Sequence, residues 1–165
     1  MSVLSVCQWL QDQPTSIAIR ESIFVYPIVE SVHVLSLCLF LGLVVMMDLR
    51  LLGIGNRHAQ VSEIQKHLFP WQMIGLVLIT VSGLVLVYAE PLRFYGNIFF
   101  RIKLVLLVAA VANAMIFHVT TYRSVGEWDQ ARVPPFPAKV AGAVSLTVWA
   151  GVVVCGRMIA YAWFK

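Results

Sequence analysis

The stretch VESVHVLSLCLF at positions 29–40 decides the class of this protein, because it sets an acid and an imidazole at the head of a long apolar run. Glu30 and His33 are three residues apart, so a helix places them on the same face. The apolar run covers about 22–48, which is long enough to cross a membrane as a helix. Ionisable side chains inside a membrane are costly and usually functional, so both residues are candidates for a site.

The rest of the chain has the same apolar character. Of its 165 residues, 60% are hydrophobic and 12% are charged, which is about half the charged content of a soluble domain. Three further windows, 69–89, 99–121 and 138–162, are long enough for helical spans and too continuous for the strands of a membrane barrel. We therefore expect an all-α polytopic membrane protein, a bundle of four transmembrane helices in one domain covering residues 1–165.

The polar segments outside these windows set the arrangement in the membrane. An apolar helical face near the N-terminus predicts a short helix over about 2–12 that lies in the membrane interface. Four spans place both termini and the second interhelical loop on one face, called side A, and the other two loops on side B. Six basic residues belong to each side, so the positive-inside rule favours neither orientation. The net charge of +4 is spread over helix ends, which does not indicate nucleic-acid binding.

Several classes of chemistry are excluded or unsupported. Cys7, Cys38 and Cys155 form no CxxC and no CxxCH motif, which excludes covalently attached c-type haem. The sequence has no GxGxxG, P-loop, HExxH or GxSxG motif, so nucleotide binding and hydrolase chemistry lack support.

The four histidines are the candidate metal ligands. His67 and His118 belong to adjacent spans at similar depth toward side B, and imidazoles on facing helices are a common way to hold haem iron. His33, roughly two turns away in depth, is a candidate ligand of a second haem. The partner of His33 is then Met73, Met115 or a residue of a second subunit. His58, in the first side-B loop, is an alternative to His67.

Other polar and aromatic residues are candidates for binding the cofactor. Glu30 and Arg157 lie at similar depth and are expected to neutralise each other or to orient a ligand or a haem propionate. Propionates need cationic partners, for which side A offers Arg20, Lys103 and Arg157, and side B offers Arg50 among others. For Arg50 ordinary snorkelling to the interface is the competing interpretation. Two further candidates are Asn113, at mid-depth in the third span, and Trp71, for which packing competes with cofactor stacking.

Four motifs carry a resemblance to a known family: YPxVExxHVL at 26–35, DLRLLG at 48–53, NxxxFH at 113–118 and GRxIAY at 156–161. Together they resemble a family of small bacterial four-helix membrane proteins that is catalogued as a domain of unknown function. The resemblance covers nearly the whole chain and implies a multi-pass protein of the bacterial inner membrane. In plan, the architecture is also similar to small b-type cytochromes, which hold two haems between histidine pairs. This chain offers one such pair and a single His33.

The sequence therefore predicts a membrane b-type cytochrome that binds one or two haem b per chain and carries electrons without turnover of its own. Its expected partners are membrane lipid and a second copy of the chain, a redox partner protein or a quinone. The alternative is a transporter or channel for protons or a soft metal ion, with Glu30, His33 and Asp48 along its path. A third interpretation is an accessory membrane subunit whose polar residues only fix helix pairing.

Overall fold

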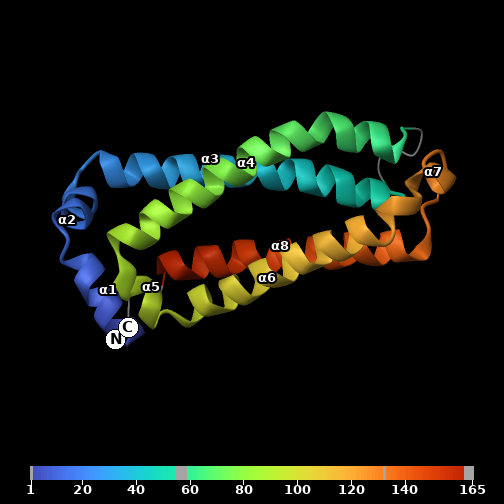
Figure 1. Ribbon diagram of the computed structural model, residues 1–165. Helices are drawn as coiled ribbons and strands as arrows, with labels where there is room; N and C mark the ends of the chain where they lie inside the picture. Colours follow the sequence, from blue (N-terminus) through green and yellow to red (C-terminus); the bar gives the residue numbers. More distant parts are fainter. Residues whose placement is uncertain (1, 55–58, 132, 162–165) are drawn as a thin grey trace.

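Four long helices dominate the computed structural model, which describes residues 2–54, 59–131 and 133–161 (Figure 1). These are α3 (Val25–Leu51), α4 (Val61–Ala89), α6 (Ile98–Val119) and α8 (Phe136–Tyr161). Each is long and apolar enough to cross a membrane, and the described residues form no strand. The predicted all-α class with four spans is therefore confirmed. Their outer surfaces expose many large apolar side chains, as lipid contact requires.

Short helices cover both ends of the long ones. At side A lie α1 (Val3–Gln11), α2 (Pro14–Glu21) and α5 (Pro91–Gly96), and at side B lie η1 (Tyr122–Ser124) and α7 (Val125–Trp128) (Figure 1). A helix thus forms where one was expected near residues 2–12, and α1 packs against α5. The helix α2 was not expected. Its Pro14 occupies the first turn, where a missing N–H removes no helical hydrogen bond.

The start of α4 differs from the sequence expectation, because the helix begins at Val61 and not near 69. Asp129, from the far side-B loop, caps this end. Its carboxylate accepts hydrogen bonds from the backbone N–H of Ser62 at 2.8 Å and from the Ser62 hydroxyl at 2.5 Å. The helix continues through Pro70, which has no N–H and therefore removes one backbone hydrogen bond. Membrane helices tolerate such a loss because neighbouring groups can satisfy the freed carbonyl.

The long helices are arranged as two antiparallel pairs. Helix α3 packs along α4 and α6 packs along α8, and contacts between α3 and α8 join the pairs (Figure 1). Helices α4 and α6 share no extended contact. At the junction, the rings of Phe40 and Trp149 meet edge to face with centroids 5.1 Å apart. Three of the six pairs of long helices are thus packed together, while α4–α6, α4–α8 and α3–α6 share no extended contact.

The side-B end is closed by a buried cluster that draws on all four long helices. Met47, Leu51, Val61, Phe117 and Ala138 form its apolar centre. Beside it, the side chain of Arg50 is only 1% exposed and donates hydrogen bonds to the Ala59 and Ala131 carbonyl oxygens, at 2.9 and 3.1 Å. A buried guanidinium that binds both side-B loops fixes how the loops close this end.

We predict that close packing at Gly142 holds the two helix pairs together. A Cβ atom there would lie 3.1 Å from the Asp48 carbonyl oxygen and 3.3 Å from the Leu51 Cβ, so α3 and α8 would have to separate. Gly142→Leu should therefore lower the free energy of unfolding in detergent by about 1–3 kcal/mol, measured by thermal denaturation.

The matched control is Gly42→Leu, because a Cβ on Gly42 meets no atom within 4 Å. Its stability should stay close to that of the unmodified protein. Equal losses from the two substitutions would show that this α3–α8 approach is not a tight contact.

Candidate functional site

His33 lies on the face of α3 that meets α4, where it is half-buried. Its Nδ1 is 3.0 Å from the Ser82 hydroxyl oxygen. That hydroxyl donates its single proton to the Leu78 carbonyl at 2.6 Å, so the imidazole must be the donor in the bond between them. Gly83 provides room for the ring, since a Cβ there would lie 3.0 Å from the His33 Cε1. His33 therefore carries its proton on Nδ1.

His67 and His118 are held in the same way by their own helices. Nδ1 of His67 lies 2.8 Å from the Glu63 carbonyl oxygen, and Nδ1 of His118 lies 2.8 Å from the Ala114 carbonyl oxygen. A carbonyl only accepts, so both rings donate from Nδ1 when neutral. Both side chains are exposed. In each of these histidines the neutral ring therefore carries its proton on Nδ1 and keeps a lone pair on Nε2. Metal-binding histidines have the same arrangement, in which the second nitrogen donates to a nearby oxygen.

The structure does not gather the histidines into one cluster. His67 is on α4 and His118 is on α6, and no contact between their rings is found; the ring neighbours of His118 are Phe117 and Tyr122. Within residues 2–54, 59–131 and 133–161, no group of three or more His, Cys, Asp or Glu side chains is placed to hold a metal ion. His58 lies outside the described residues.

The expected pair of Glu30 and Arg157 does not form. Arg157 donates to the Tyr161 hydroxyl at 2.9 Å, and its guanidinium carbon lies 4.8 Å from the centre of that ring. Tyr161 is one turn away on the same helix, which makes it the closer partner. Glu30 is exposed, and in the described parts of the chain it makes no hydrogen bond or ion pair.

Lys103 remains the best placed of the cations proposed for side A. It is half-buried on α6, and its Nζ approaches α8, where a Cβ on Gly156 would lie 3.8 Å away. No hydrogen bond or ion pair of Lys103 is found among the described residues. Arg20, by contrast, donates to the Ala89 carbonyl at 3.3 Å and so ties α2 to the end of α4.

Three other candidates have structural roles or no partner. Arg50 is enclosed by the side-B loops, which argues against the free propionate ligand that the sequence suggested. The amide nitrogen of Asn113 donates to the Ala141 carbonyl at 3.0 Å and joins α6 to α8. Trp71 is exposed on α4, and the residues described around it make no ring contact with it.

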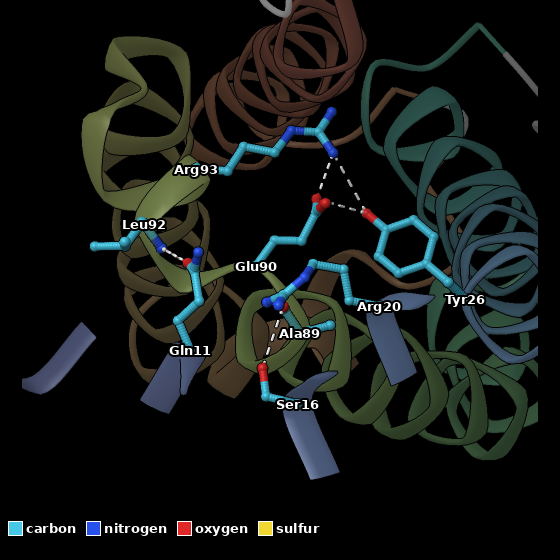
Figure 2. Close-up of polar contacts among 8 residues, drawn as sticks. All are labelled: Gln11, Ser16, Arg20, Tyr26, Ala89, Glu90, Leu92 and Arg93. Atoms are coloured by element: carbon cyan, nitrogen blue, oxygen red, sulfur yellow. Dashed lines mark hydrogen bonds and ion pairs between the residues drawn. The ribbon is translucent and has the colours of Figure 1, made fainter. Parts of the chain in front are cut away.

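A polar network at side A was not expected from the sequence (Figure 2). The Tyr26 hydroxyl donates to the Glu90 carboxylate at 3.1 Å, and Arg93 forms an ion pair with the same oxygen. Figure 2 shows Ser16 and Arg20 of α2 reaching the Ala89 carbonyl beside this pair. The spacing of Glu90 and Arg93, three residues apart around Pro91, was the available sequence signal. The network locks the short helices onto the side-A end.

Asp48, which the sequence placed on the path of a possible transporter, is a second buried polar feature. Its side chain is 5% exposed and lies near Ser145 where α3 meets α8. Its Oδ2 has no hydrogen-bond partner in the part of the chain that the structure describes. A buried carboxylate with one free oxygen can take up a proton or a cation.

Comparisons with known proteins identify a family without indicating an activity. A family model described as "Family of unknown function (DUF6644)" matches residues 21–162. A search of curated proteins and a search of solved structures each gave no match.

We predict that the hydrogen bond between His33 and Ser82 stabilises the α3–α4 pair. Ser82→Ala removes the only hydroxyl that accepts from the buried Nδ1–H, so the free energy of unfolding should fall by about 1 kcal/mol. Thermal denaturation in detergent measures this loss.

Thr80→Ala is the matched control. Thr80 is exposed on the same helix, and its hydroxyl donates to the Leu76 carbonyl, as that of Ser82 does to Leu78. If both substitutions change the stability equally, the bond to His33 contributes nothing.

Proposed function

The chain belongs to the DUF6644 family, and we propose that this member is a membrane b-type cytochrome, which binds haem b through histidine and carries electrons within or across the membrane. It acts as an electron carrier and not as a stand-alone enzyme. The proposal includes a place in the bacterial inner membrane and a redox partner protein, a quinone or a second copy of the chain.

The observation that supports the proposal is the hydrogen bonding that the three described histidines share. His33, His67 and His118 each hold Nδ1 in a hydrogen bond, and within the described parts of the chain no hydrogen bond through Nε2 is found. Histidines that bind metals donate their second ring N–H to a carbonyl, carboxylate or water, which fixes the tautomer and the ring orientation. A hydroxyl takes this place at His33. The side chains are therefore prepared as neutral Nε2 ligands.

The spacing of the helices supports one haem between His67 and His118. Directly packed helices lie about 8–10 Å apart, which leaves no room for a macrocycle between their imidazoles. Helices α4 and α6 share no extended contact, which is also true of α4 with α8 and of α3 with α6, so direct helix packing does not exclude a haem between them. His67 and His118 are the residues that would hold this haem, one from each helix. When bound, haem b supplies reversible one-electron chemistry.

A second haem would be held by His33, closer to side A. Lys103 supports this placement, because it is a half-buried cation at that end of α6 without a partner among the described residues. A propionate would supply the anion that such an ammonium needs inside the membrane. Glu30, one turn from His33 and exposed, would then orient the ligand.

A second candidate function, proton or cation transport, is favoured by one observation. The Asp48 carboxylate is buried where the two helix pairs meet, and its Oδ2 has no partner in the described residues. An acid in this position is suited to accept and release a proton. Transport does not explain why three separate histidines keep Nε2 free, so we rank it second.

The proposal predicts a coloured protein. Purified after expression with ample haem, the protein should show a Soret band that shifts on dithionite reduction, and a pyridine haemochrome assay should count one or two haem b per chain. His67→Ala and His118→Ala should each remove the same haem, while His33→Ala should remove the other or, at one haem per chain, none.

The control is His58→Ala, which should leave the haem count unchanged if His67 is the ligand. A colourless protein would overturn the cytochrome proposal. Proton flux into liposomes that falls with Asp48→Asn would then identify the transport function instead.

A further inference from the structure

A pocket of about 560 Å³ opens at side B, apart from the histidines. It lies where α6 ends, η1 and α7 turn back, and α8 begins (Figure 1). Seven residues line it: Thr120, Thr121, Ser124, Glu127, Trp128, Pro135 and Pro137. None of them has a part in the proposed haem sites, so the pocket needs an explanation of its own.

The hydroxyl groups of the pocket offer acceptors and no free protons. The Thr120 hydroxyl donates to the Ile116 carbonyl at 2.6 Å, and the Ser124 hydroxyl donates to the Thr121 carbonyl at 3.2 Å. The Thr121 hydroxyl lies 3.4 Å from that of Thr120 and is therefore the donor between them. Each hydroxyl has one proton, so any further hydrogen bond to a ligand would use an oxygen lone pair.

Charges of both signs meet at the pocket: Glu127 and the carbonyl end of α6 favour a cation, and the N-terminal end of α8, which begins at Phe136, favours an anion. Glu127 is exposed, and its carboxylate makes no hydrogen bond or ion pair with the residues described here. The last carbonyls of α6, which ends at Val119, carry the negative end of the helix dipole. Trp128 adds an aromatic ring, and its Nε1–H, which is buried without a hydrogen-bond partner in the described residues, is a donor suited to an anionic group. The flanking basic residues Arg123 and Lys139 do not line the pocket.

We propose that this pocket binds the primary ammonium group of an aminophospholipid headgroup. An ammonium has three N–H donors and no acceptor, which matches a pocket of acceptor oxygens and a carboxylate. The candidate span that includes α6 extends to Trp128, so the pocket lies where hydrocarbon gives way to headgroups. The exposed side chains of Ile116 and Val119, directly below, provide an apolar surface for the acyl chains.

The experiment compares lipids that differ only in the headgroup. The full chain in detergent micelles is titrated with phosphatidylethanolamine or phosphatidylcholine of the same acyl chains, and bound lipid is counted by native mass spectrometry. The choline group has no N–H donor, so phosphatidylethanolamine should bind about tenfold more tightly. Equal binding of the two lipids would overturn the proposal.

Glu127→Gln identifies the site, with Glu63→Gln as the matched control. Glu63 is also an exposed side-B glutamate, but it does not line the pocket. Glu127→Gln should reduce phosphatidylethanolamine binding about tenfold to the choline level, and Glu63→Gln should not. Unchanged binding by Glu127→Gln would place the lipid elsewhere and overturn the assignment. Tighter binding of free ethanolamine than of phosphatidylethanolamine would overturn the lipid source in favour of a soluble amine.

Discussion

A polar group without a partner inside hydrocarbon is costly, and this constraint decides how the polar side chains of the long helices are placed. Hydroxyls at buried and exposed positions alike donate back to their own helix, as the buried Ser36 does to the Val32 carbonyl at 2.7 Å and the exposed Thr147 does to the Ala143 carbonyl at 2.9 Å. The histidines obey the same constraint. Because each imidazole satisfies it through Nδ1, the tautomer that leaves Nε2 free follows from membrane burial itself.

The same constraint accounts for how the helices are joined. Polar contacts accompany the packed interfaces. His33 and Ser82 join α3 to α4, Asn113 and the Ala141 carbonyl join α6 to α8, and Asp48 lies near Ser145 where α3 meets α8. Such polar contacts make helix pairing specific, because an apolar side chain packs about equally well against lipid and against another helix. Among the described residues no such bond joins α4 to α6, the helices that carry the exposed His67 and His118.

Much of the fold could be predicted from the sequence, because long apolar windows and the interruptions between them set the number of spans. The start of α4 could not, since its cap is Asp129, which is close in space and 67 residues away in the chain. The depth of each residue in the membrane could be predicted from its position along a helix. The helix face on which each side chain lies relative to the other helices could not, because helices that are apolar on all sides do not show which face meets protein. Arg157 accordingly reached Tyr161 and not Glu30. Residue type identified the candidate histidines, but their tautomer required the positions of Ser82, Glu63 and Ala114.

The tautomer of the histidines is the most direct quantity to measure, because the proposed haem ligation depends on a free Nε2. The protein would be labelled with ¹⁵N-histidine and studied without haem in a bilayer by NMR, at a pH at which imidazole is neutral. Nδ1–H tautomers are expected for His33, His67 and His118, and each signal is assigned by its loss in the corresponding alanine variant. Nε2–H tautomers at His67 and His118 would contradict the proposed ligation.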